Sequence, residues 1–154
     1  MKKAFFLFLF PLFLHASELY TMLGVNAEKT ALDEGKGISF GWGVKSVFEN
    51  SWFVDIGFLL GYSYIEKDNR YRYGFDCKSG YKQDGVQIFA LVSGIMQNYG
   101  IYNSAGFGYG GGVEYRFNGS SLGVGSALRH YDMTSEVKEY GFDLIQLYFV
   151  YYLH

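Results

Sequence analysis

His130 is the strongest candidate for a catalytic base, because the other two histidines lie near the ends of the chain. A catalytic histidine needs a nucleophile or an orienting carboxylate within hydrogen-bond reach. Ser126 is four residues away, which is about 13 Å along a strand and therefore too far. Asp132 and Ser135 are nearer, but no motif connects them to His130. We therefore expect no catalytic site.

The sequence contains no set of residues that is typical of a metal or cofactor site. The only cysteine, Cys77, cannot form an intramolecular disulfide and is expected to act as a small apolar residue. One internal histidine and scattered carboxylates do not form a ligand set of recognisable spacing. The glycines of residues 106–112 lack the lysine and the helix that a phosphate-binding loop requires. We therefore expect neither a metal nor a cofactor.

Alternation of apolar with polar or small residues dominates the chain and is typical of β-strands. The even positions of residues 52–65 are all apolar, and the even positions of residues 70–82 are all charged or glycine. Residues 105–117 repeat the pattern. The 154 residues include 15 Tyr, 15 Phe and 21 Gly. So many aromatic residues disfavour disorder, and so much glycine disfavours a helical bundle, since each interior glycine costs a helix about 1 kcal/mol.

Eight such segments can be counted. They cover residues 19–27, 38–45, 52–65, 70–82, 86–97, 105–117, 122–131 and 140–153. The predicted connections are residues 28–36, 49–51, 67–69, 83–85, 98–103, 118–120 and 132–139. Asn118 and Gly119 form a strong signal for a two-residue hairpin turn. Residues 66–85 could instead form one long loop, which would make the strand count odd.

The first 16 residues differ from the rest and predict a secretory signal. Lys2 and Lys3 precede the apolar residues 4–14, and Ala16 provides a small-residue cleavage site. The apolar run is shorter than the about 20 residues that a membrane-spanning helix needs, and no later stretch predicts such a helix. Residues 17–154 then carry 11 basic and 15 acidic side chains, so no excess of positive charge is available to bind nucleic acid.

We interpret residues 17–154 as an all-β domain, an eight-stranded antiparallel up-and-down transmembrane β-barrel. The alternative is a secreted β-sandwich, whose strands average about 5–6 residues, whereas a strand that crosses an outer membrane needs about 9–11. Most of the segments counted here contain 10 to 14 residues. Aromatic residues near the segment ends also match the girdles of membrane barrels. The predicted girdle residues are Trp52, Tyr62, Tyr64, Tyr71, Tyr73, Tyr81, Tyr115 and Phe117.

Charged residues on the strands should face the lumen, because a basic side chain at the bilayer midplane costs about 2–4 kcal/mol. The predicted lumen charges are Lys45, Asp55, Arg72, Asp76, Lys78, Glu114, Arg116 and Arg129, with Asp143 as a further candidate. An eight-stranded barrel is only wide enough for its own side chains to fill it. We expect these charges to pair and close the lumen. The alternative is a narrow porin-like channel for ions or small solutes.

Residues 106–117, the turn at Asn118 and Gly119, and the aromatic-rich end of the chain resemble the small porin-like, OmpA-type outer-membrane barrels of Gram-negative bacteria. The resemblance covers roughly residues 17–154. It implies a location in the cell outer membrane, insertion by the outer-membrane barrel assembly machinery, and contact with outer-membrane lipids and lipopolysaccharide. Such chains usually end in an aromatic residue, whereas this one ends in Leu153 and His154.

From these observations we expect a monomer with a structural or surface-interaction role in the cell envelope and no enzymatic activity. Enzymes on small outer-membrane barrels do act on the lipid part of lipopolysaccharide, so a lipid-modifying enzyme is a second alternative. For the final segment we place Gln146 inward, because lipid offers an amide no hydrogen-bond partner. The outward residues are then Ile145, Leu147, Phe149, Tyr151 and Leu153.

Overall fold

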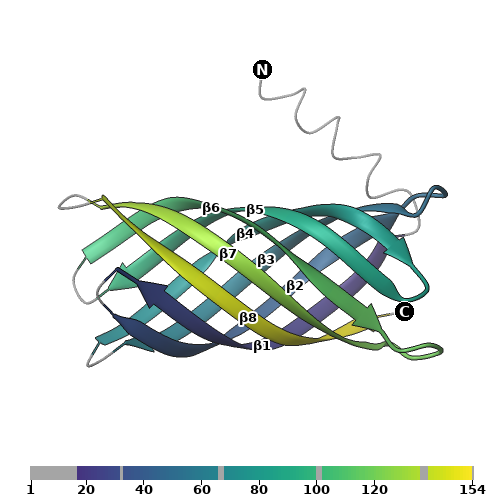
Figure 1. Ribbon diagram of the computed structural model, residues 1–154, viewed down its shortest axis with the longest axis horizontal. Coiled ribbons are helices and arrows are strands. Elements are labelled where there is room, and N and C mark those ends of the chain that lie inside the picture. Colours follow the sequence, from purple (N-terminus) through teal and green to yellow (C-terminus); the bar gives the residue numbers. More distant parts are fainter. Residues whose placement is uncertain (1–16, 32, 66–67, 100–101, 136–138, 154) are drawn as a thin grey trace, which may run out of the picture.

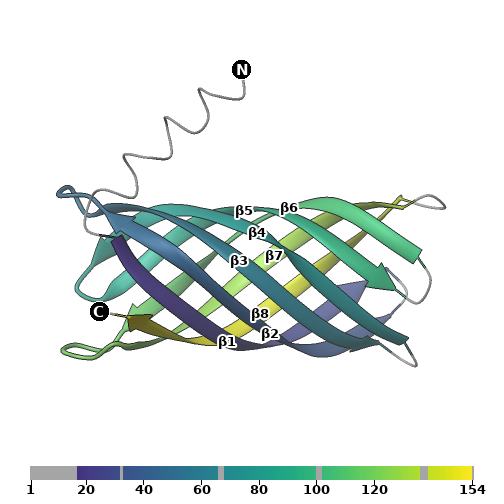
Figure 2. The same ribbon diagram turned by 180° about the vertical axis from the view of Figure 1, so that it is seen from behind.

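The computed structural model describes residues 17–31, 33–65, 68–99, 102–135 and 139–153, so the predicted signal segment, residues 1–16, lies outside the described residues. The described residues form eight strands in one closed barrel (Figures 1 and 2). The strands are β1 (Ser17–Thr30), β2 (Glu34–Val47), β3 (Trp52–Ile65), β4 (Asp68–Gln83), β5 (Val86–Tyr99), β6 (Tyr102–Arg116), β7 (Leu122–Ser135) and β8 (Glu139–Leu153). Among the described residues no helix is long and apolar enough to cross a membrane.

The predicted eight-stranded antiparallel barrel is confirmed. Each strand pairs antiparallel with the next, and β8 closes the barrel against β1. β4 is a strand of 16 residues, so the alternative of one long loop over residues 66–85 is wrong. The connections predicted at residues 28–36, 98–103 and 132–139 are too long, because the flanking strands extend into all three. Polar residues occupy both faces near several strand ends, such as Glu28 inward and Lys29 outward, which is why the sequence underestimates the length of these strands.

The prediction of a two-residue hairpin at Asn118 and Gly119 is wrong. β6 ends at Arg116 and β7 begins at Leu122, so the connection contains five residues. The two-residue turn is instead at Asp84 and Gly85 between β4 and β5, where φ is 50° and 84°. Two successive positive φ values are the requirement of a type I′ turn, which matches the twist of paired strands.

The strands separate two kinds of surface, with large apolar side chains exposed outside the barrel and nine charged side chains buried inside. On β8 the exposed large apolar residues are Ile145, Leu147, Phe149, Tyr151 and Leu153. Gln146 on the same strand is 1% exposed. The prediction for the faces of the final strand is therefore confirmed, and the distribution is the inverse of that in a water-soluble protein.

Glycines inside the barrel give room to large neighbouring side chains. A Cβ atom at Gly108 would lie 2.4 Å from the ring of Tyr131, and one at Gly125 would lie 2.4 Å from the ring of Tyr148. Both separations are far below van der Waals contact. These glycines are therefore what allows two tyrosines to fit in the lumen.

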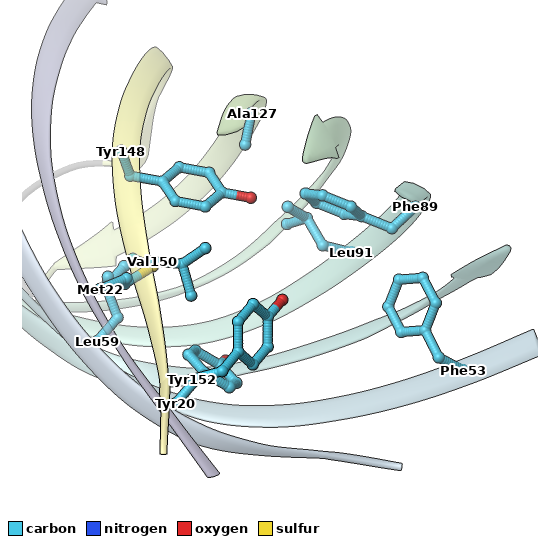
Figure 3. Close-up of a cluster of buried hydrophobic side chains, with 10 residues drawn as sticks. All are labelled: Tyr20, Met22, Phe53, Leu59, Phe89, Leu91, Ala127, Tyr148, Val150 and Tyr152. Atoms are coloured by element: carbon cyan, nitrogen blue, oxygen red, sulfur yellow. The ribbon is translucent and has the colours of Figure 1, made fainter. Parts of the chain in front are cut away.

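The apolar part of the interior is dominated by large side chains that point at one another across the lumen (Figure 3). This cluster consists of Tyr20, Met22, Phe53, Leu59, Phe89, Leu91, Ala127, Tyr148, Val150 and Tyr152. Its tyrosine hydroxyls are the link between the apolar packing and the buried charges.

Candidate functional site in the barrel interior

One group of buried charges joins opposite walls of the barrel. Lys45 on β2 and Glu114 on β6 are 3.0 Å apart, and both side chains are almost fully buried. Three strands separate β2 from β6 in either direction around the barrel. Glu114 also accepts hydrogen bonds from the Gln87 amide (3.1 Å) and from the hydroxyls of Tyr148 (3.1 Å) and Tyr152. The carboxylate is thus held by partners from three other strands.

A second pair lies on neighbouring strands. Lys78 on β4 contacts Asp55 on β3 at 3.3 Å. The hydroxyl of Tyr20 donates a hydrogen bond of 2.7 Å to the other oxygen of Asp55. Both oxygens of this buried carboxylate therefore have a partner, which a charge in a low-dielectric interior requires.

A third pair connects β4 with β7. The guanidinium of Arg129 lies 2.7 Å from Asp76 and donates a second hydrogen bond of 3.0 Å to Gln146. The hydroxyl of Ser93 donates to the other oxygen of Asp76 at 2.7 Å. Gln146 in turn donates to the Ser39 hydroxyl. A continuous set of polar contacts therefore crosses the middle of the lumen.

The sequence missed a fourth group, centred on Glu28. This carboxylate is 2% exposed and contacts Arg70 at 2.9 Å and Arg72 at 2.6 Å. The prediction that residues 28–36 form a connection hid its role. A usable signal was present, because Glu28 continues the inward alternation of Gly24 and Asn26 by one more step.

The last group lies where β1 begins and β6 ends. Arg116 donates a hydrogen bond to Glu18 and another, of 3.1 Å, to the carbonyl of Ser120. Its guanidinium also lies 4.4 Å from the centre of the Tyr152 ring. Glu18 is a further partner that the sequence missed, since it precedes the first recognisable alternation.

These side chains leave little free space. In the described part of the chain, the pocket between Asn26, Arg72 and Gln146 has a volume of about 10 Å³. A single water needs about 10–15 Å³. This pocket therefore has room for about one water.

The predicted lumen residues fall into two classes. Buried inside the barrel are Lys45, Asp55, Arg72, Asp76, Lys78, Glu114 and Arg129, and Arg116 is partly buried. The candidate Asp143 is wrong, because it lies on the outer face with its side chain exposed. Asp143 is two residues before Ile145 on β8, and alternate residues of a strand face the same side. Asp143 therefore points outward with Ile145, although a carboxylate would be expected to prefer the lumen.

The predicted girdle residues lie on the outer face. Exposed there are Trp52, Tyr64, Tyr71, Tyr73, Tyr81, Tyr115 and Phe117, and Tyr62 is partly buried. At one end of β3 the rings of Trp52 and Tyr81 are 6.2 Å apart, and at the other end those of Tyr62 and Tyr71 are 5.2 Å apart. Aromatic pairs therefore occur at both ends of the same two strands.

His130 also faces outward and contacts two carboxylates. Its Nδ1 lies 2.7 Å from Asp143 on β8, and its Nε2 lies 3.3 Å from Asp132 on its own strand. The sequence named Asp132 as a neighbour but did not predict the contact with Asp143. This arrangement orients the imidazole, and both of its nitrogens face carboxylates.

No protein-family model and no curated protein matches the chain, but solved structures do. Neisserial surface protein A is 12% identical and has a TM-score of 0.60, with 88% of this chain and 96% of that one covered. Ail of Yersinia pestis is 12% identical with a TM-score of 0.63, and 89% and 97% are covered. The chain has the fold of the small Gram-negative outer-membrane β-barrels. The resemblance inferred from the sequence is thereby confirmed for the architecture.

The same fold carries different functions among these proteins. The outer membrane enzyme PagL is 12% identical to this chain with a TM-score of 0.53, and 84% of this chain and 98% of that one are covered. Identities this low establish the fold alone. The function must therefore be argued from the side chains of this small outer-membrane barrel.

Proposed function

We propose that the protein is a structural barrel of the Gram-negative outer membrane, with a lumen closed by its own side chains and no enzymatic activity. The buried ion pairs that cross the interior are the observation that carries this proposal. Buried ion pairs link β2 with β6, β4 with β7 and β1 with β4, and the space in the middle accommodates about one water. A transport pathway would need a continuous aqueous route instead.

The outer face supports the membrane location. Leucine, isoleucine and phenylalanine side chains cover it, and apolar surface of this extent would cause aggregation in water. Aromatic residues border this belt at both ends of β3 and β4. The barrel would contact outer-membrane lipids and lipopolysaccharide as a monomer, after insertion by the outer-membrane barrel assembly machinery.

The location has a direct test. Expressed in a Gram-negative host, the protein is expected to sediment with outer-membrane markers in a density gradient and to migrate faster on gels before heating than after, because a closed barrel resists detergent. Recovery in the soluble periplasmic fraction would overturn the membrane assignment, although the barrel fold would stand.

The closed lumen predicts electrical silence. In planar bilayers the folded protein is expected to give no steady openings. The Arg116→Ala variant should also give none, because Arg116 lies at one end of the barrel and the ion pairs in the middle remain. A double variant with alanine at Asp76 and Arg129 removes one pair from the middle and tests how far this pair closes the lumen. Steady conductance in the wild type would contradict the proposal and favour the narrow channel.

A lipid-modifying enzyme is the second candidate, and one observation favours it. His130 and Asp143 form a hydrogen-bonded pair on the outer face, where membrane lipids would be substrates. Both nitrogens of the imidazole contact carboxylates, however, so the ring is occupied on the side where a nucleophile would be activated. A changed mass spectrum of membrane lipids on overproduction, lost in His130→Ala, would establish the enzyme.

A further inference from the structure

A shallow groove of about 1040 Å³ crosses the outer face of the barrel. It runs over six neighbouring strands from β6 to β3, of which β7, β8 and β1 lie at the front of Figure 1. It is separate from the lumen, because most of its side chains point outward. With strands about 4.8 Å apart, the groove is roughly 24 Å long.

Two rows of side chains border the groove, and each row takes one residue from each strand that it crosses. One row is apolar in its centre, since Leu128, Ile145 and Ala27 are direct partners on β7, β8 and β1. The small side chain of Ala27 leaves a hollow beside the exposed Ile145. This row offers the surface that an acyl chain needs.

The other row alternates in charge. His130 on β7 pairs with Asp143 on β8, Asp143 with Lys29 on β1, and Lys29 with Glu34 on β2. The His130 to Asp143 distance is 2.7 Å and the Lys29 to Glu34 distance is 3.8 Å. Lys29, Glu34 and Asp143 remain well exposed, so their charges are available to a ligand.

We propose that this groove binds one zwitterionic phospholipid, with an acyl chain along the row of Leu128, Ile145 and Ala27 and the headgroup on the charged row. The inference rests on the proposed membrane location. The phosphate would lie at Lys29 and the ammonium at Asp143, the neighbour of Lys29 on β8.

The charge pattern selects the kind of lipid. Lipopolysaccharide and phosphatidylglycerol present anionic groups without a compensating cation and would favour a row of basic residues. Here cations and anions alternate along the row. A headgroup with one phosphate and one ammonium complements this order, and phosphatidylethanolamine has both.

Native mass spectrometry of the folded, delipidated protein in detergent tests the proposal, with phosphatidylethanolamine, phosphatidylglycerol and lipopolysaccharide added separately. We expect one phosphatidylethanolamine per barrel, bound up to about fivefold more tightly than phosphatidylglycerol, because both lipids offer the phosphate and only phosphatidylethanolamine adds an ion pair through its ammonium. Ala27→Trp fills the hollow and should abolish this adduct. Val25→Trp, on the same strand and face but outside the groove, should retain it, and Lys29→Gln with Asp143→Asn should remove the preference.

Four results would overturn the inference. They are the absence of an adduct, equal binding by the Ala27→Trp and Val25→Trp variants, a preference for lipopolysaccharide or phosphatidylglycerol, and a dimer that displaces the lipid from the same face. If the folded barrel fractionates with the outer membrane but gives one of these results, only the lipid site fails. If it does not reach the membrane, the proposed function fails first.

Discussion

Glu114→Ala is expected to lower the free energy of unfolding by about 3–5 kcal/mol, because it leaves the buried ammonium of Lys45 without a carboxylate. Gln87, Tyr148 and Tyr152 lose their acceptor at the same time. Denaturant unfolding of the protein in lipid vesicles measures the change. The barrel should still close, since the eight strand pairings do not involve this side chain.

The matched control removes both charges of the pair. Lys45→Met combined with Glu114→Leu replaces the ion pair by apolar groups of similar volume, an exchange that is often close to neutral in other proteins. The double variant should therefore be more stable than Glu114→Ala, and the difference measures the cost of an unpaired charge. Equal stability of the two variants would mean that water reaches Lys45 and that the lumen is not closed.

Leu147→Arg should destabilise the barrel in a bilayer by about 2–4 kcal/mol, whereas Leu153→Arg should cost about 0–1 kcal/mol. Both leucines are on β8 and face outward, with 57% and 46% of their surface exposed. Leu147 lies near the middle of the strand and Leu153 is its last residue. The two substitutions are chemically identical and differ only in depth, so the contrast reports on the membrane itself.

Denaturant unfolding in lipid vesicles measures both changes in the free energy of unfolding. In thicker bilayers the destabilisation by Leu153→Arg should increase more than that by Leu147→Arg, because Leu153 then lies deeper in the hydrocarbon. If both arginines are tolerated equally, the outer face is not surrounded by hydrocarbon. The proposed location would then be wrong, even though the barrel fold would stand.

The sequence predicted the barrel because the alternation of a strand is a local property, which can be recognised without knowing which strands pair with one another. The same locality explains its errors. Glu28 was placed in a connection because carboxylates prefer water, and Asp143 was placed in the lumen because carboxylates avoid lipid. In the structure the position along the strand decides which way each side chain points, so Glu28 faces inward and Asp143 outward. The contact between His130 and Asp143 depends on the register of β7 with β8, and no local pattern encodes that register.

The turns illustrate the same limit. Asp84-Gly85 and Asn118-Gly119 are equally good signals for a tight hairpin. Only the first forms a two-residue turn, because Gln83 and Val86 are partners in the sheet. The second lies inside a five-residue connection, since Arg116 pairs with Gly123. Sheet register therefore determines which of two similar dipeptides becomes the turn.

The pairs that cross the lumen link the order of folding to the closure of the barrel. Lys45 and Glu114 are 69 residues apart in the chain, Asp76 and Arg129 are 53 apart, and Glu28 and Arg72 are 44 apart. These charges remain hydrated while the sheet is open and can pair only when its walls face each other. Dehydration of the interior and docking of β1 against β8 should thus occur in one late step. Such non-local closure is slow, and it leaves no stable half-barrel with a dry interior.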